Sequence, residues 1–311
     1  MKTLSCDPLL VAIVGPTATG KSRLALGLAR ALHGEIVNCD SMQMVRGMDI
    51  GTAKPSRQEQ ATVPHHLYDR VDPDGWYSAG QYMEEARPVC REIAGRGRVP
   101  LVVGGTGLYL RALLLGVFEG PGRSQEYRQH LRQVVSNKGK AALHEMLVRV
   151  DPSSAQRIQP TDVVRVVRAL EVYHLAGRPI SDLQGERKFL TGFRVVKIGI
   201  GLEREKLYVR IDSRVREMFR AGLLGEVEGL ISQGFSPECK GFEAIGYRQV
   251  VACLNGQIGL EEAVESTCTD TRRYAKRQMT WFRREPDLQW VSAPGENQET
   301  LAKTLELVGG L

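Results

Sequence analysis

Short apolar runs alternate along this chain with longer segments in which apolar residues recur at helical spacing. The runs predict four buried strands, at Leu9–Val14, Glu35–Cys39, Val99–Val103 and Arg194–Ile200. The segment after the first run repeats leucine and alanine every three or four positions and predicts a helix. Strands that alternate with helices predict an α/β fold, in which helices cover both faces of a parallel sheet.

The segment 123–192 has a different pattern. It is rich in Arg, Gln and Lys, contains no convincing buried strand, and predicts helices with breaks at Asp151-Pro152 and Gln159-Pro160. The strand pattern resumes after it. We therefore expect a helical insertion domain at 123–192 within an α/β core formed by residues 1–122 and 193–311.

The C-terminal third predicts further helices. One amphipathic helix is expected at about 212–233 and a second at 261–284, because apolar residues recur on one face of each. The tail then predicts a short strand, at 289–291, and a last helix.

The first strand runs directly into the sequence GPTATGKS, residues 15–22. Gly15 and Gly20 let the backbone bend so that several N–H groups point inward, and a helix starting near Lys21 adds its positive N-terminal end. Lys21 suits terminal phosphate oxygens, and the Ser22 hydroxyl suits a Mg²⁺ ion. We expect a P-loop NTPase-like core with a phosphate site here. Most such loops hold ATP or GTP, so the loop alone does not define the reaction.

Two further polar segments follow predicted strands. Asp40 ends the second strand, and the turn Gly104–Thr106 ends the third. Ligands of parallel sheets bind at the carboxyl ends of strands, so both segments should converge on the phosphate loop. There, Asp40 could bind a metal or accept a proton from a nucleophile, and the Thr106 hydroxyl could contact a ligand. The alternative is that both residues only cap helices or turns.

The formal net charge of +6 is by itself weak evidence for a polyanionic partner. The segment 271–284 says more, because it holds six basic residues and no acidic one, interleaved with Tyr274 and Trp281. This pattern suits RNA, through phosphate contacts and base stacking, although a solvated basic helix has the same composition. The polar face of this expected helix comprises Arg273, Lys276, Arg277, Thr280 and Arg284.

The insertion carries a second pair of basic residues. Arg165 and Arg168 lie three positions apart and so share one face of a helix, with valines and Leu170 packing on the other. The usual meaning of such arginines is a solvated face, and contact with a phosphate backbone is the alternative.

Composition favours a cytoplasmic protein. The longest apolar runs are far shorter than a membrane span, and cleavage of a signal peptide would remove the strand before the phosphate loop. The six cysteines are scattered without a CxxC pair, as expected for reduced thiols. His65 and His66 are adjacent, so on an extended segment their side chains point in opposite directions and are poorly placed to share a metal.

Together these motifs resemble the tRNA isopentenyltransferase family. The resemblance spans nearly the whole chain in order, and its motifs are GPTATGKS (15–22), DSMQ with RGMDIGTAKP (40–55), PHHLYD (64–69), YSAGQY (77–82), VVGGTGLYLRAL (102–113), RVVRALEVY (165–173), IGYRQ (245–249) and RRYAKRQMTWFR (272–283). The family usually has Tyr where Val45 stands and Gln where Val164 stands, and these departures weaken individual contacts.

The resemblance implies transfer of a dimethylallyl group from dimethylallyl diphosphate to the exocyclic N6 amine of the adenine 3′ to the anticodon. Mg²⁺ is the implied cofactor, with Ser22 as its ligand. The implied catalytic residues are Asp40, as the base for the amine proton, and Thr106. The implied diphosphate site comprises Gly15, Thr17, Ala18, Thr19, Gly20, Lys21, Ser22 and Arg214. The implied tRNA contacts are Asp40, Ser41, Met42, Gln43, Thr106, Arg128, Arg165, Arg168, Gly246, Tyr247, Arg248, Arg273, Lys276 and Arg277.

Other functions remain open from the residues alone. The chain could prenylate free adenine nucleotides, act as an ATP-dependent kinase, or be a non-catalytic RNA-binding module. The basic insertion and the segment 271–284 favour a tRNA anticodon stem-loop as the partner, and a binding module would leave the phosphate loop and Asp40 unexplained. We expect a monomer, and we expect the target adenine to be flipped out of the anticodon loop to reach the donor.

Overall fold

The structure is a computed structural model that describes residues 7–118, 120–183, 185 and 188–309. Its chain divides into two compact units, one formed by Met1–Leu114 with Leu190–Leu311 and the other by Leu115–Phe189. The predicted insertion, 123–192, overlaps the second unit, and its assignment as a tRNA-binding domain stays a prediction. No helix in the described part of the chain is long and apolar enough to cross a membrane.

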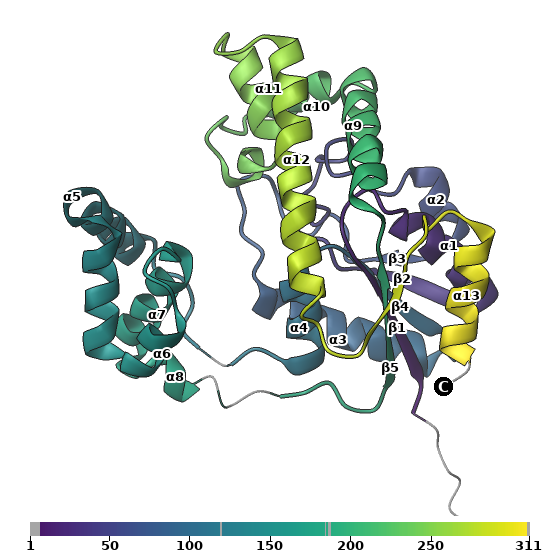
Figure 1. Ribbon diagram of the computed structural model, residues 1–311, viewed down its shortest axis with the longest axis horizontal. Coiled ribbons are helices and arrows are strands. Elements are labelled where there is room, and N and C mark those ends of the chain that lie inside the picture. Colours follow the sequence, from purple (N-terminus) through teal and green to yellow (C-terminus); the bar gives the residue numbers. More distant parts are fainter. Residues whose placement is uncertain (1–6, 119, 184, 186–187, 310–311) are drawn as a thin grey trace, which may run out of the picture. The chain divides into compact units, whose positions relative to one another are not determined.

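The first unit is built on a six-stranded parallel sheet, which confirms the predicted fold class (Figure 1). Its strands are β1 (Leu9–Val14), β2 (Gly34–Asn38), β3 (His65–His66), β4 (Val99–Gly104), β5 (Arg194–Ile200) and β6 (Leu288–Val291). They lie in the order β3-β2-β4-β1-β5-β6, so β1 and its phosphate loop are central. The two-residue β3 is too short to carry a periodic signal, so the sequence pattern does not predict it.

The helices are arranged on both faces of this sheet and beyond its carboxyl edge (Figure 1). Those of the first unit are α1 (Lys21–Ala31), α2 (Arg57–Thr62), α3 (Ala79–Gly95), α4 (Gly107–Leu115), α9 (Arg204–Arg220), α10 (Leu223–Ser232), the 3₁₀ helix η1 (Lys240–Glu243), α11 (Tyr247–Leu254), α12 (Leu260–Phe282) and α13 (Gln298–Gly309). Alternate residues of β1 enter two separate cores: Leu10 and Ala12 lie in a cluster with side chains of α3 and α4, whereas Val11 and Ile13 lie with those of α1. This alternation follows from the two-residue period of a strand.

One predicted helix is wrong in its extent. The segment 212–233 was expected to form a single helix, but it contains the end of α9 and all of α10. Gly222, between them, has φ of 102°, a left-handed conformation that glycine adopts at little cost and that ends helical geometry. The helix expected at 261–284 is confirmed as α12.

The described residues of the second unit form helices and connecting loops, with no strand among them. It contains α5 (Gln125–Val150), α6 (Pro152–Arg157), α7 (Val163–Ala176) and α8 (Ile180–Leu183), so the breaks predicted near the two prolines are confirmed. An additional break lies inside α5, where Gly139 has φ of 81°. Leu131, Leu147 and Val166 are fully buried in the core of this unit.

Candidate functional site

The phosphate loop joins β1 to α1 through three residues with positive φ. Gly15 has φ of 140°, Ala18 of 63° and Gly20 of 88°. At Gly15 a side chain would collide with the backbone of Ile200, which explains why glycine is needed there. Gly20 is the N-cap of α1 and makes no side-chain capping hydrogen bond. The first amides of the helix have no partner within the helix and are therefore available to an anion.

Three carbonyl oxygens of the loop accept hydrogen bonds, two of them from residues outside the loop. The Ala18 oxygen accepts a hydrogen bond from Arg210 Nε at 2.8 Å, and the Thr19 oxygen accepts one from the Gly295 amide at 2.9 Å. The Pro16 oxygen accepts bonds from the Thr19 hydroxyl and from Lys21 Nζ. These three carbonyl oxygens already accept hydrogen bonds. The loop can therefore turn its N–H groups towards an anion without turning these oxygens towards the same anion.

Three charged side chains predicted for the site affect one another electrostatically, so the structure brings them together. Burial lowers the pKa of Lys21 to about 7, with Asp40 opposing this shift and Arg214 adding to it. Burial also raises the pKa of Asp40, although a backbone N–H from Met42 and the charges of Lys21 and Arg214 hold it back. The pKa of Arg214 is lowered by burial and supported by Asp40. The pKa of each group is thus displaced from its ordinary value, as is typical of functional sites.

Asp40 and Thr106 belong to one hydrogen-bonded turn region at the ends of β2 and β4. Asp40 Oδ1 accepts from the Met42 amide at 3.0 Å. Thr106 Oγ1 accepts from the Ser41 amide at 3.0 Å, and the Thr106 amide donates to the Cys39 oxygen at 3.1 Å. The Thr106 side chain therefore holds the segment beside Asp40.

The segment after Asp40 is fixed by a carboxylate that sequence analysis did not identify. Glu226 of α10 accepts hydrogen bonds from the successive amides of Asp49, Ile50 and Gly51. It also accepts from the Tyr247 hydroxyl at 2.6 Å. Tyr247 is 0% exposed, so its predicted role as a tRNA contact requires correction: its side chain supports this loop from inside the fold.

Further predicted tRNA contacts lie close to this loop. Gln43 donates to the Thr52 and Ala53 oxygens and so orders the segment that contains it. Arg248, which follows Gly246 at the start of α11, forms an ion pair with Asp270 at 2.6 Å. These residues stay candidates for RNA contact.

Helix α12 has the two faces that its sequence predicts. Arg273, Lys276 and Arg277 are exposed. The opposite face is buried and includes Gln278, whose amide bonds to both the phosphate loop and the turn that contains Thr106. Burial raises the pKa of the Tyr274 phenol, and the charge of Asp40 raises it further.

The arginines of the second unit differ in their surroundings. Arg128 forms two hydrogen bonds to Glu171, at 2.6 and 2.8 Å, and Arg168 bonds to the same carboxylate at 2.8 Å. Burial alone would raise the pKa of Glu171, but the bonds from both arginines lower it to about 2. Arg165 is exposed and pairs only weakly with Asp162, at 3.3 Å. Of the three predicted RNA contacts in this unit, Arg165 is therefore the most accessible.

The residues present suit a magnesium ion that is shared with a phosphate ligand. Among the described residues, no three His, Cys, Asp or Glu side chains gather as metal ligands. Mg²⁺ usually binds through one or two protein oxygens, with phosphate oxygens and water completing its shell. The Ser22 hydroxyl, exposed in the first turn of α1, is such an oxygen. His66, by contrast, bonds through Nε2 to Glu35 at 2.7 Å.

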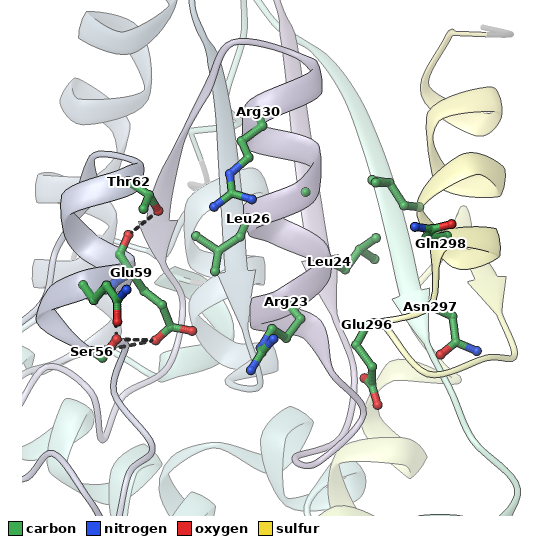
Figure 2. Close-up of a pocket in the computed structure, with 14 residues that line it drawn as sticks. Arg23, Leu24, Leu26, Arg30, Ser56, Glu59, Thr62, Glu296, Asn297 and Gln298 are labelled. Atoms are coloured by element: carbon green, nitrogen blue, oxygen red, sulfur yellow. Dashed lines mark hydrogen bonds between the residues drawn. The ribbon is translucent and has the colours of Figure 1, made fainter.

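A groove of about 620 Å³ lies between α1, α2 and the turn before α13 (Figure 2). It is lined by residues of both charges, including Arg23, Arg30 and Glu59. Glu59 already bonds to Ser56 in the cap of α2. None of the predicted site residues lines the groove, although its lining residue Gly295 donates a hydrogen bond to the Thr19 oxygen of the phosphate loop.

Comparison with known proteins matches the sequence of this chain to one family. The sequence model of the family described as IPP transferase matches residues 43–285. The tRNA dimethylallyltransferase of Geobacter sulfurreducens is 51% identical over 286 residues, covering 92% of each chain, and that of Koribacter versatilis is 45% identical, covering 97% of this chain and 98% of the relative.

Two solved structures extend the likeness to the fold. The full-length tRNA isopentenylpyrophosphate transferase of Bacillus halodurans is 40% identical with a TM-score of 0.72, covering 97% of this chain and 96% of that one. A eukaryotic dimethylallyltransferase acting on tRNA is 28% identical with a TM-score of 0.79, covering 97% of this chain and 80% of that one. With a phosphate loop, a half-buried carboxylate and these relatives, the chain belongs to the IPP transferase family.

Proposed function

We propose that this chain transfers a dimethylallyl group from dimethylallyl diphosphate to the N6 amine of the adenine 3′ to the anticodon in tRNA, releasing diphosphate. The observation that carries the proposal is the grouping of Lys21, Asp40 and Arg214 at the phosphate loop in a member of this family. Two cations beside a phosphate loop suit a diphosphate, and a carboxylate with a raised pKa suits proton transfer.

In the reaction, the bond between the allylic carbon and the diphosphate oxygen breaks while the bond to the adenine nitrogen forms. Negative charge grows on the departing diphosphate. The loop amides, Lys21 and Arg214 stabilise that charge, and this stabilisation is greater in the transition state than in the bound donor. Lys21, with a pKa of about 7 before the donor binds, becomes fully protonated beside the diphosphate.

The adenine amine is neutral and weakly nucleophilic, so it gains from loss of its proton as the new bond forms. Asp40 is the base that accepts this proton. Its hydrogen bond from the Met42 amide orients one carboxylate oxygen. Thr106, linked to the Ser41 amide, provides a hydroxyl oxygen beside the base and positions the segment that carries Asp40.

Mg²⁺ fits this site, with the Ser22 hydroxyl as its protein ligand. When bound, the ion would neutralise part of the diphosphate charge. The exposed arginines and lysine of α12, with Arg165 in the second unit, would hold the tRNA backbone while the target adenine is flipped out of its stack. Since its substrate is tRNA, we infer a cytoplasmic location, and we expect a monomer.

The test supplies labelled dimethylallyl diphosphate with tRNA, with free AMP or with no acceptor, and uses labelled ATP in a separate reaction. We expect label on the tRNA adenine, and neither AMP nor ATP should replace the tRNA or the donor. Prenylation of AMP at the same rate would favour the nucleotide-modifying alternative. Tight binding and hydrolysis of ATP without binding of the prenyl donor would favour a kinase.

A further inference from the structure

One buried amide on α12 joins the two loops that would hold the donor and the acceptor. Gln278 Oε1 accepts a hydrogen bond from the Thr17 amide at 2.9 Å, and its Nε2 donates to the Gly105 oxygen at 2.9 Å. The residue is 5% exposed. A side chain at Gly105 would collide with this amide, so the glycine of the turn and the glutamine of the helix fit each other closely.

These two partners belong to different parts of the site. Thr17 lies in the phosphate loop, whereas Gly105 directly precedes Thr106 in the turn next to Asp40. Transfer requires the reacting carbon and nitrogen to approach to about 3–3.5 Å, and a displacement of about 1 Å can slow a reaction roughly 100-fold. The distance between these loops therefore bears directly on the rate of transfer.

We propose that Gln278 is a positioning residue that holds the phosphate loop and the Thr106 turn in register for transfer. The inference rests on the proposed function. Because Gln278 uses the Thr17 amide, it also removes that N–H from the diphosphate site and leaves the following amides to the donor. Gln278 lies on the same helix as the basic surface, because the exposed residues Lys276 and Arg277 directly precede it.

A buried glutamine could instead serve stability alone, and Gln249 provides a matched control for that role. It is also 5% exposed; its Oε1 accepts from the Gly246 amide at 2.8 Å and its Nε2 donates to Asp270 at 2.9 Å. Neither partner belongs to the phosphate loop or the Thr106 turn. Replacement of either glutamine by methionine removes one bond to an amide and one to an oxygen from a buried site.

The decisive measurement is single-turnover transfer with tRNA and dimethylallyl diphosphate both saturating. We expect Gln278→Met to slow transfer about 10- to 100-fold, with little change in the dissociation constant of inorganic diphosphate. Gln249→Met should lose similar thermal stability and keep the transfer rate. Wild-type rates in Gln278→Met, or a loss confined to diphosphate binding, would overturn the inference. A wild-type protein that does not prenylate tRNA would instead overturn the proposed function.

A second variant, Gln278→Glu, keeps the test open if the methionine variant fails to fold. The carboxylate can accept from the Thr17 amide but cannot donate to the Gly105 oxygen. Once protonated it can do both, and burial raises the pKa of such a carboxyl. Asp40, Lys21 and Tyr274 are present in both proteins, so the ratio of variant to wild-type rates isolates the new group. We expect this ratio to rise as pH falls, and a flat ratio would contradict the inference.

Discussion

The two units of this protein each contain a group of charged side chains, but the two groups are in opposite states. In the first unit, burial lowers the pKa of Lys21 to about 7 and raises that of Asp40, so burial disfavours the charged form of each group. In the second unit, hydrogen bonds from Arg128 and Arg168 lower the pKa of Glu171 to about 2. There the charged forms are fully favoured.

This difference separates charged groups that burial disfavours from a carboxylate whose charge is satisfied by its own unit. The Glu171 carboxylate is fully buried and bonded to two arginines and the Ser124 amide, so its charge is satisfied within the unit. Lys21 donates to the Pro16 oxygen, which carries no full charge. A bound diphosphate would supply the missing negative charge. Arginines that bond to a buried carboxylate are therefore weaker evidence of function than a cation and an acid whose pKa values burial shifts towards their neutral forms.

The largest expected effect is on the chemical step. Asp40→Asn should slow transfer by roughly 10²–10⁴-fold, because a positioned general base typically contributes that much. Diphosphate and tRNA binding should persist, since the amide keeps an oxygen that can accept from the Met42 amide. Single-turnover rates measure this effect, and a loss below about fivefold would mean that Asp40 is not the base.

The matching change in the second unit should affect stability and leave chemistry intact. Glu171→Gln leaves Arg128 and Arg168 without their anionic partner, and loss of one member of a buried ion pair costs about 3 kcal/mol. Since the pKa of Glu171 is below its unfolded value, the wild-type unit should also lose this stability as pH falls from about 4.3 towards 2. Denaturant unfolding at several pH values tests both statements, and unchanged stability in the variant would refute them.

Sequence and structure agree most closely where a pattern is local. The strand at Leu9–Val14 and the phosphate loop after it follow from an apolar run, two glycines and a lysine. The contacts that complete the site are not local: Arg210 and Gln278 reach the loop from about 190 and 260 residues further along the chain. No local sequence pattern indicates such pairs, because the partners meet only in the folded chain. The break at Gly222 was missed for a different reason, because apolar residues on both sides continue one helical pattern.

The basic face of α12 allows a third comparison, between exposed and internally paired cations. Lys276→Glu with Arg277→Glu should weaken tRNA binding and flatten its salt dependence, because each lost phosphate contact lowers the logarithmic salt slope by about 0.7–0.9. Arg168→Gln, which removes a cation already paired with Glu171, should change that slope much less. Binding titrations at several salt concentrations test this, and equal slopes in both variants would place the RNA elsewhere.

The smallest expected effect concerns the protonation of Lys21. With a pKa of about 7, this lysine is roughly nine-tenths neutral at pH 8 in the free protein. A bound diphosphate raises its pKa, so binding at pH 8 should take up nearly one proton, and diphosphate affinity should fall by up to about tenfold per pH unit above 7.

Inorganic diphosphate is suitable as a probe because its own remaining protonation near pH 8 can be measured separately. Calorimetry in buffers of different ionisation enthalpy measures the proton count. Lys21→Met should abolish the protein's share of the uptake and flatten the pH dependence, whereas Asp40→Asn should leave that share in place. Binding to the wild-type protein without proton uptake would show that Lys21 is already charged, and the contrast with Glu171 would then rest on Asp40 alone.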